Sequence, residues 1–524
     1  MRSKSWIILI FFIVLVCVLR ISTFFQSVID WDESVYLLMS KSILDGNLPY
    51  IQVWDHKPPG IYLLFSLSQI VFGQSVISIR ILTCIFVSIS CLFLYKSGNV
   101  INPHNNQNGL LAGILYAFFS LKNGGLSANT ELFFTFFNIL AFYLIFITLF
   151  SSNKELIFHK FRFFIIGLVM GISLHIKYLV IFDFIAIFLI VISYYYLKSS
   201  NRKLMGLTKI VLCLLTGSFI PFLLFMLYFL KSGYLNEYIY ANFIANKIYS
   251  AETQFSIRYF SEVILGQSVQ NHPLWLCLFL TPFYLYFLVP RKSEESYKFY
   301  VLLIWFFMAF IGTCVTKKFY PHYFLQVLPP LCLISSYMVI TLLDTSNLKP
   351  IRLDFALILI FLLPLLLSSS KPLKASMQFI SKKYVQNSVH WQDTPTLVSK
   401  YIKSRIREDD YIYIADYQPI IYYLTNSKIP TKYVLPNWFI KQEFSRFTGV
   451  NLAQELSSIL DKDPAYIVIK NSYNLNENNE FYIRIRNHIK EKYVLDNKID
   501  NILLYRFNKL NKYTSHNSNN SYEF

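Results

Sequence analysis

Charged residues are scarce in this sequence. Asp, Glu, Lys and Arg make up 15% of the 524 residues, whereas soluble globular proteins are usually about 25% charged. Hydrophobic residues make up 55%, the mean hydropathy is +0.43, and the long apolar runs lie before about residue 370. This composition excludes an ordinary soluble enzyme, and it indicates that most of the chain lies in a membrane.

Two other features are missing, a cysteine framework and a signal-peptide cleavage site. The cysteines show neither a disulfide framework nor a zinc spacing, because all of them fall within or at the ends of apolar runs: Cys17, Cys84, Cys91, Cys213, Cys277, Cys314 and Cys332. The first apolar run, residues 6–29, follows Arg2 and Lys4, but Arg20 and Phe-rich flanks stand where small residues would allow cleavage. We therefore expect an uncleaved first helix with its N-terminus inside.

The net charge of +18 would suggest nucleic acid as a partner for a soluble protein. Here the basic residues sit mostly in short loops between apolar runs, where they orient helices, so no nucleic-acid partner is expected. Spans need ~20 apolar residues each. Eleven are predicted, near residues 6–29, 75–95, 108–122, 129–150, 163–178, 179–197, 208–231, 273–289, 299–316, 322–343 and 353–369.

Threading these spans alternately places the basic loops in the cytoplasm, in agreement with the positive-inside rule. Three segments are then left outside: loop 30–60, loop 232–272 and everything after about residue 370. The sequence thus predicts a transmembrane domain over residues 1–369 and an extracytoplasmic domain over 370–510. The polar residues 511–524 are predicted to be disordered.

The extracytoplasmic segment alternates strand-like and helical patterns. Strands are expected at 411–415, 465–469 and 502–507, and helices at 419–425, 452–460 and 481–493. This alternation predicts a small α/β domain. No Gly-rich phosphate loop follows a strand there, so no nucleotide is assigned to it.

The first outer loop opens with three carboxylates, Asp30, Asp32 and Glu33, beside Trp31 and Tyr36. At a membrane surface such a cluster could act as a general base towards a hydroxyl group, or hold a divalent cation. The alternative is that the carboxylates only mark the end of a helix and keep it outside.

Further along the same loop, Asp55, His56 and Lys57 precede Pro58 and Pro59. The two prolines stiffen the backbone and hold the Lys57 cation just above the bilayer, where a lipid phosphate would lie. The alternative is a snorkelling lysine beside a turn.

Three other sites should face the same side. Glu131 begins an apolar run and is either a helix cap or an acid facing a cavity. Lys177 ends the fifth span, where it is either functional or lifted into the headgroups. The third site is a cluster of possible anion contacts, in which the lysines could also be interface anchors: Lys317, Lys318, Tyr320 and His322.

The order and the common membrane face of these motifs resemble the bacterial polytopic GT-C glycosyltransferases. These are relatives of the protein O-mannosyltransferases and the aminoarabinose lipid A transferases, and are described as dolichyl-phosphate-mannose-protein-mannosyltransferase-like. The resemblance covers most of residues 1–345, and the outer α/β domain also suits the family. It implies a helical GT-C fold and transfer of a sugar from a polyprenyl-phosphate carrier to a lipid, glycan or protein acceptor.

The resemblance also implies roles for individual residues. Asp32 matches an acid that acts as general base or orients the acceptor, with Glu33 beside it as the second catalytic candidate. Lys57 matches a residue that contacts the donor phosphate, where His322, Lys317 and Lys318 are also expected to contribute. The remaining candidates are expected to line the cavity or contact the acceptor: Glu131, Asp30, His56, Tyr320 and Lys177.

Physical reasoning supports this chemistry. An inverting displacement needs a base for the nucleophile and positive charge at the departing phosphate, and the first outer loop offers both. Asp30 and Asp32 have the DxD spacing that oligosaccharide-transferring relatives use for a metal, but the single-sugar relatives generally work without one. We therefore expect no obligatory cofactor. Asp55 and His56 stand where the aminoarabinose transferases have an aromatic residue and Glu, which argues against lipid A and aminoarabinose as substrates.

Two other functional classes are weighed against this one. A flippase of lipid-linked sugars would want polar residues through the span interiors and internal repeats, whereas the polar clusters here collect at the outer ends of spans. A receptor would not need eleven spans to anchor an outer domain. The sequence therefore predicts an inverting membrane glycosyltransferase of the bacterial cytoplasmic membrane, with membrane lipids as its surroundings and its active site outside.

Overall fold

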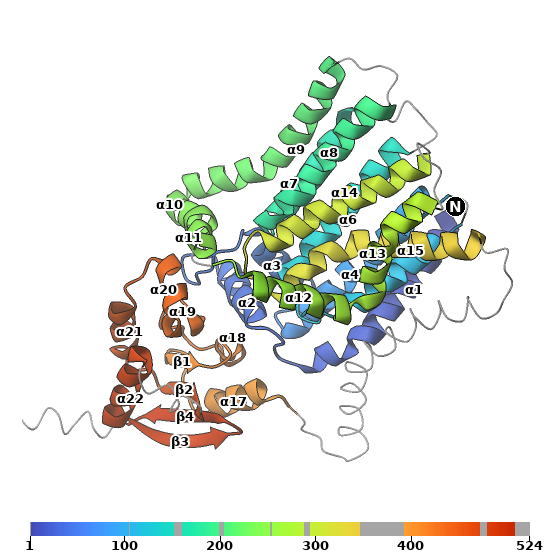
Figure 1. Cartoon of the computed structure of the whole chain (residues 1–524). Helices are drawn as coiled ribbons and strands as arrows, with labels where there is room; N and C mark the ends of the chain where they lie inside the picture. Colours follow the sequence, from blue (N-terminus) through green and yellow to red (C-terminus); the bar gives the residue numbers. More distant parts are fainter. Residues whose placement is uncertain are drawn as a thin grey trace, which may run out of the picture.

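A helical bundle and a C-terminal α/β domain make up the structure, a computed structural model (Figure 1). It describes residues 2–103, 105–150, 160–198, 204–251, 254–287, 294–345, 392–471 and 479–508. The predicted eleventh span, the predicted domain boundary near residue 370 and the predicted disordered tail lie outside the described residues.

Ten of the eleven predicted spans coincide with helices. Seven helical stretches in the described part are long and apolar enough to cross a membrane, and they contain α1 (Arg2–Arg20), α4 (Val76–Ile101), α6 (Thr130–Leu149), α8 (Ile181–Lys198), α9 (Leu204–Lys231), α14 (Glu294–Cys314) and α15 (Leu328–Thr345). The other three predicted runs form shorter helices: α5 (Gln107–Phe119), α7 (Lys160–Leu174) and α13 (His272–Phe287). The predicted class, a multi-pass helical membrane protein, is confirmed.

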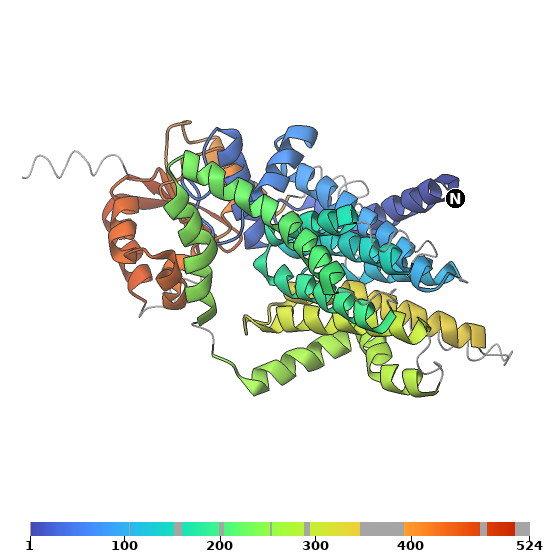
Figure 2. The same cartoon turned by 90° about the horizontal axis from the view of Figure 1, so that it is seen from above.

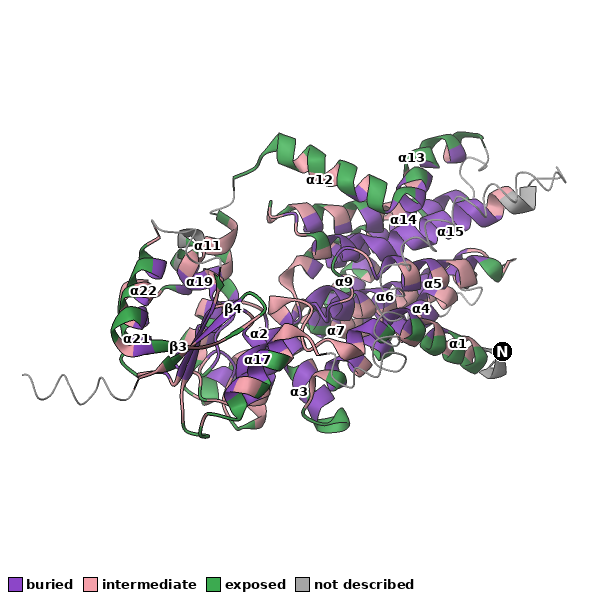
Figure 3. Cartoon of the chain, turned by 90° about the horizontal axis from the view of Figure 1, so that it is seen from below, coloured by how far each residue is buried: buried purple, intermediate pink, exposed green. Residues whose placement is uncertain are grey.

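The two segments expected to be outer loops contain helices of their own. In and after the first are α2 (Trp31–Leu44) and α3 (Gly60–Phe72); in the second are α10 (Leu235–Ile239), the π-helix η4 (Tyr240–Ile244), α11 (Ala245–Ala251) and α12 (Ile257–Gln270). Short 3-10 helices join the spans: η1 (Ile21–Phe25), η3 (Tyr178–Val180) and η5 (Pro321–Val327). α12 is largely exposed at the side of the bundle (Figure 3).

Local signals explain why α2 forms where a loop was expected. Asp30 caps the helix, since its side chain accepts a hydrogen bond from the backbone N–H of Asp32. Asp32 and Glu33 lie in the first turn and Lys41 in the last, as the helix dipole favours. With 14 residues and these charges, α2 is too short and too polar to be recognised as a span.

Glycine allows two spans to pack closely. The backbones of α7 and α9 come so near that a Cβ atom on Gly167 would lie 2.1 Å from the carbonyl oxygen of Leu214. One turn further on, a Cβ on Gly171 would lie 2.5 Å from the carbonyl oxygen of Ser218. This is the small-xxx-small pattern of membrane helix pairs. After α9, the chain continues into α10 and α11.

The C-terminal domain contains a four-stranded mixed sheet. Its elements are α17 (Thr394–Lys403), β1 (Ile412–Asp416), α18 (Ile420–Thr425), α19 (Asn437–Ile440), α20 (Gln442–Thr448), α21 (Leu452–Leu460), β2 (Tyr466–Lys470), α22 (Glu480–Lys492), β3 (Tyr493–Ile499) and β4 (Ile502–Phe507). The strand order is β1-β2-β4-β3, in which β1 and β2 are parallel and the other pairs antiparallel. The expected α/β domain is present.

The three predicted strands are confirmed, but β3 was missed. It is an edge strand whose outward residues are charged or exposed, including Val494 and Leu495. Such an edge leaves no run of buried alternating residues for a sequence pattern to reveal.

Several hydrogen bonds join the C-terminal domain to one end of the bundle, where it lies beside α10 and α11 (Figure 2). The backbone N–H and the hydroxyl of Ser27 donate to Asp393 Oδ2 at 2.7 and 2.6 Å. The backbone N–H of Trp54 donates to the carbonyl of Lys432 at 2.9 Å. These bonds place the domain over the end of the bundle that carries the candidate residues.

The packing of α7 on α9 predicts opposite effects for two Gly-to-Ala substitutions. Gly167→Ala should destabilise the protein by about 1–3 kcal/mol, because its Cβ would collide with backbone. Gly266→Ala in the exposed helix α12 has open space around its Cβ and should be neutral or stabilising by up to about 1 kcal/mol. Thermal unfolding in detergent measures both, and equal effects would contradict the packing described here.

Candidate active site

The segment that carries Lys57 is fixed by its sequence. Pro58 and Pro59 restrict the backbone before α3 begins at Gly60. The backbone N–H of Gly60 donates to the carbonyl of His175 at 2.8 Å, and a Cβ on Gly60 would lie 2.5 Å from that same oxygen. Glycine at this position therefore lets the segment after α7, with Lys177, approach the segment that carries Lys57.

Lys57 lies between two carboxylates. Its Nζ is 3.1 Å from Asp32 Oδ2 and 3.7 Å from Asp55 Oδ2, and lies over the ring of Tyr36. Burial alone would lower the pKa of Lys57, but Asp32 and Asp55 outweigh it and hold that pKa above its usual value. Lys57 is therefore a cation at neutral pH.

The pKa values of Asp32 and Asp30 shift in opposite directions. Burial and the charge of Asp55 would raise the pKa of Asp32, but Lys57 and His322 together outweigh them, and the pKa is lowered. Burial, and then the charge of Asp32, raise the pKa of Asp30. Asp30 accepts hydrogen bonds from the backbone of Asp32 at 3.3 Å and from Asn129 Nδ2 at 3.2 Å. Adjacent acids whose environments push their pKa values apart are candidates for different roles.

A second buried pair joins Lys177 and Glu131. The Lys177 ammonium forms an ion pair with Glu131 Oε1, and its Nζ is 3.8 Å from the centre of the Tyr323 ring. The His322 ring packs edge to face on Tyr323 at 4.9 Å and stacks on Tyr320 at 5.7 Å. Residues from three distant parts of the chain therefore meet at one end of the bundle.

These groups surround a cavity of about 710 Å³ between the bundle and the C-terminal domain. Seven of the eleven candidate residues line it: Asp30, Asp32, His56, Lys57, Lys177, Tyr320 and His322. The structure thus brings together acids, cations and aromatic rings from positions nearly 300 residues apart. The volume is within the usual range of about 300–1,000 Å³ for small-molecule sites.

The structure places Glu33 outside the lining of this cavity. Its carboxylate is fully buried and forms a bidentate ion pair with Arg80 of α4, with the Nη2 to Oε2 distance 2.9 Å. It also accepts the backbone N–H groups of Ile29 at 2.9 Å and Ala128 at 2.5 Å. Glu33 does not line the cavity, so its position differs from that of a group that touches a substrate. The sequence pattern could not distinguish it from Asp32, because its partner is 47 residues away.

Three other candidates also lie outside the lining. Glu131 is behind Lys177 and holds it. Lys318 lies over the ring of Tyr249 at 4.3 Å, and Lys317 is exposed on a turn with a positive φ of 58°. Lys318 thus contacts a cavity residue, whereas Lys317 lies towards solvent.

The roof of the cavity was not predicted from the sequence. It is made by α11 and by the segment around α19 and α20, through Asn246, Tyr249, Leu435, Asn437, Trp438, Phe444 and Phe447. Trp438 packs edge to face on Trp54 at 5.2 Å, and Phe447 packs on His56 at 5.1 Å. The concentration of aromatic residues between 438 and 447 was the available signal.

The DxD spacing does not gather further metal ligands. Asp30 caps α2 and Asp32 pairs with Lys57. Among the residues that the structure describes, no three His, Cys, Asp or Glu side chains come together as a metal site would require. Whether a metal is needed for activity stays a prediction.

Part of the chain matches a known protein family. Residues 56–231, about a third of the chain, match the family model described as dolichyl-phosphate-mannose-protein mannosyltransferase. This region includes Lys57, Glu131 and Lys177. No curated protein matches the sequence.

Solved structures with a similar fold cover almost the whole chain. ArnT from Cupriavidus metallidurans, bound to undecaprenyl phosphate, is 12% identical with a TM-score of 0.59, over 96% of this chain and 98% of ArnT. The oligosaccharyltransferase AglB from Archaeoglobus fulgidus, in complex with an inhibitory peptide and a dolichol-phosphate, is 13% identical with a TM-score of 0.53, over 97% of this chain and 75% of AglB. The arabinofuranosyltransferase AftD from Mycobacteria is 9% identical with a TM-score of 0.51, over 97% of this chain and 40% of AftD.

The family model and the fold confirm the predicted resemblance to the mannosyltransferase-like GT-C glycosyltransferases. They support the predicted enzyme class and a multi-pass membrane protein, and they lend no support to the flippase alternative.

The Glu33 ion pair predicts a large cost for breaking it. Arg80→Met should destabilise the protein by about 3–5 kcal/mol, because it leaves a buried carboxylate unpaired. The double variant Glu33→Gln, Arg80→Met should recover part of that loss. Arg258→Met, which breaks an exposed pair with Glu262, should cost less than about 1 kcal/mol. Thermal unfolding measures all three, and a mild effect of Arg80→Met would contradict this account.

Proposed function

We propose that this chain transfers a sugar from a polyprenyl-phosphate carrier to an acceptor in the cavity below the C-terminal domain. The observation that carries the proposal is the Lys57–Asp32 contact of 3.1 Å in the cavity wall. It places a cation for the donor phosphate beside a carboxylate for the acceptor. The polyprenyl-phosphate lipids bound to the two solved relatives support this choice of donor.

The donor phosphate is proposed to bind at Lys57. Lys57 is shared by Asp32 and Asp55, so an arriving phosphate can replace Asp32 while the buried Asp55 keeps the ammonium in place. Lys177 and His322 line the same cavity and add positive charge or hydrogen-bond donors. Lys317 and Lys318 are proposed to attract the anionic donor from nearby rather than to contact it.

Displacement of Asp32 from Lys57 prepares the chemical step. The released carboxylate loses its cation, so its pKa rises and it becomes a better proton acceptor. The acceptor hydroxyl or amine attacks the anomeric carbon and gives its proton to Asp32. The bond from that carbon to the phosphate oxygen breaks, and the phosphate leaves with the electron pair. Attack opposite the leaving group inverts the anomeric configuration.

The remaining candidates receive supporting roles. Asp30 and Asn129 hold the start of α2, and Glu131 holds Lys177. His56 and Tyr320 are proposed to form the wall on the acceptor side. Glu33 is proposed to act through Arg80 as a positioning residue for Asp32. A lipid, glycan or protein acceptor, and the outer face of a bacterial cytoplasmic membrane, are also part of the proposal.

Asp32 and Asp30 provide a matched pair for testing the base. Asp32→Asn should lower kcat by about 10²–10⁴-fold, whereas Asp30→Asn keeps the helix cap and should lower it less than about tenfold. The measurement follows loss of labelled sugar from a panel of polyprenyl-phosphate sugars with acceptors from membrane extracts. The reverse order of effects would assign the base to Asp30. If wild type consumes no donor while labelled lipid changes leaflet in vesicles, the transport alternative holds.

The pH dependence of kcat/KM also distinguishes Asp32 from Asp30 as the proposed base. In the free enzyme the pKa of Asp32 is lowered, so its carboxylate stays ionised until the pH falls below the usual value of 3.8. The acid limb of kcat/KM, which reports the free enzyme, should therefore lie below about pH 4. The pKa of Asp30 is raised, so a limb clearly above pH 4 that disappears in Asp30→Asn would contradict the assignment to Asp32.

Lys57→Met should remove the main positive charge to which the donor phosphate is proposed to bind. We expect kcat/KM for the donor to fall at least about 10²-fold, since groups aimed at developing charge contribute about 3–4 kcal/mol. Lys247→Met, an exposed lysine on α11 that does not line the cavity, is the matched control and should change kcat/KM less than twofold. Equal effects in both variants would show that only general surface charge matters.

A further inference from the structure

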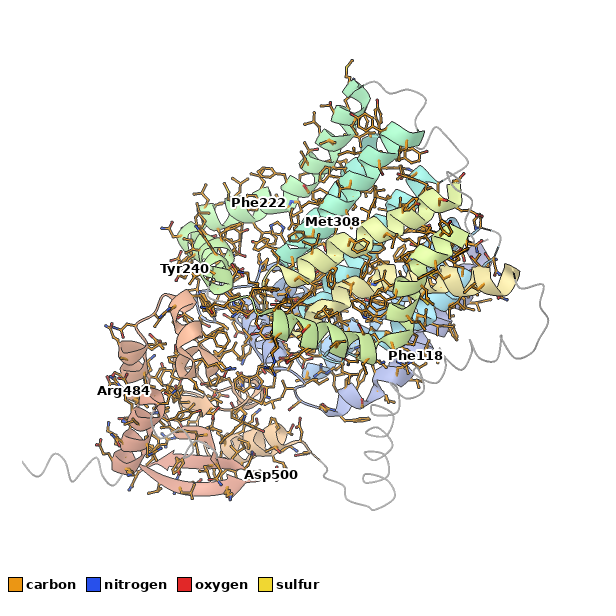
Figure 4. The ribbon with its side chains drawn as sticks, viewed as in Figure 1. Phe118, Phe222, Tyr240, Met308, Arg484 and Asp500 are labelled. Atoms are coloured by element: carbon orange, nitrogen blue, oxygen red, sulfur yellow. The ribbon has the colours of Figure 1, made fainter. Side chains whose placement is uncertain are left out.

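A second cavity lies on the other side of the Trp54 segment. Its volume is about 470 Å³, and it is lined by the first outer segment, by α10 and η4, and by two turns of the C-terminal domain: Tyr50, Trp54, Asn236, Glu237, Ile239, Tyr240, Ile244, Lys432, Tyr433, Thr448 and Gly449. None of these residues lines the first cavity. Figure 4 shows Tyr240 at the end of the bundle, facing the C-terminal domain.

The two cavities share a wall of aromatic rings. Trp54 lines the second cavity and packs on Tyr433 at 5.6 Å. It also packs on Trp438 at 5.2 Å and on Phe447 at 5.8 Å, both of which line the first cavity. A ligand in the second cavity would therefore lie one ring away from the first.

Tyr50 links the second cavity to Lys57. It is fully buried and has a φ of 74°, a conformation that a non-glycine residue rarely adopts. Its hydroxyl donates to the backbone carbonyl of Lys57 at 2.9 Å. Strained residues of this kind gather at functional sites. Tyr50 thus ties the wall of the second cavity to the backbone of the residue proposed to hold the donor phosphate.

The opposite wall also has irregular backbone. Tyr240 begins the π-helix η4, and its hydroxyl donates to the carbonyl of Phe447 at 3.2 Å. Gly449 has a φ of 70°, and a Cβ there would lie 2.2 Å from the Tyr240 hydroxyl. Single π-helical turns are frequent at functional sites. The close approach of Tyr240 to the C-terminal domain therefore depends on glycine at position 449.

The lining selects for a neutral ligand with many hydroxyl groups. Tyr240 offers ring surface, Trp54 and Tyr433 expose only small parts of their rings, and Asn236 and Glu237 offer hydrogen-bonding groups. Glu237 and Lys432 balance each other in charge, and no described residue forms an ion pair with Glu237. A carboxylate disfavours a phosphate, and the polar groups disfavour an acyl chain.

We propose that this second cavity binds a saccharide. Pyranose rings present apolar C–H faces to aromatic side chains and hydroxyl groups to acids and amides, which is the mixture found here. That the bound saccharide is the distal part of a glycan acceptor rests on the proposed function. Saccharide binding itself does not depend on that function.

The test uses the full chain in lipid nanodiscs and an array of immobilised oligosaccharides. Ile244→Trp fills the second cavity, and Glu237→Gln removes its carboxylate. Ile257→Trp, at an exposed position of α12 outside both cavities, is the matched control. We expect wild type to bind at least one class of oligosaccharide and the first two variants to bind it at least tenfold more weakly. Ile257→Trp and Lys57→Met should bind within twofold of wild type.

The outcomes separate this site from the proposed reaction. No binding by wild type, or unchanged binding by Ile244→Trp, overturns the saccharide site. Binding lost in Lys57→Met but kept in Ile244→Trp would put the saccharide in the first cavity and also overturns it. If the expected binding pattern is found while no polyprenyl-phosphate sugar is consumed, the saccharide site stands and the proposed transfer fails.

Discussion

A carboxylate buried next to a membrane must have its charge neutralised. Several segments of the chain come together around Glu33 and supply the groups that do this. The Arg80 guanidinium and two backbone N–H groups surround it completely. Through these bonds one side chain joins the segment between η1 and α2, the start of α2, the beginning of α4 and the turn before α6. Because isolated charges are so costly in an apolar surrounding, none of these parts can move independently of the others.

The position of the first cavity follows from that junction. Asp30 and Asp32 lie at the same end of α2 as Glu33 but line the cavity, and Lys57 reaches Asp32 from the segment before α3. Each cavity lysine is already paired with an acid, Lys57 with Asp32 and Lys177 with Glu131. An anion that approaches Lys57 or Lys177 therefore competes with a carboxylate for the ammonium group. This arrangement would link the arrival of a phosphate to the release of Asp32, and so favour reaction only when the donor is present.

Much of the fold and of the candidate site could be predicted wherever a short stretch of sequence carries the pattern. The spans follow from runs of apolar residues, and the strands β1, β2 and β4 follow from short buried runs between turns. Lys57 and Asp32 were found because proline and an acidic cluster mark them in the sequence itself. The function of Glu33 could not be separated from that of Asp32, since neighbouring acids on a helix point in different directions and only their partners reveal which one faces the cavity. The aromatic roof around Trp438 was missed, because the aromatic residues between 438 and 447 form a recognisable cluster but do not reveal where their domain lies on the bundle.

The sequence by itself determined that the chain is a polytopic helical membrane protein with a small α/β domain, and that its candidate site residues gather at one end of the spans. Hydrophobic runs and loop charges are enough for this, because they act over a few turns of chain. Only the tertiary structure decided which of those groups share a cavity, that the C-terminal domain covers it, and that Trp54 separates it from a second one. These depend on contacts between segments hundreds of residues apart, such as Ser27 with Asp393, and no local pattern records such a contact.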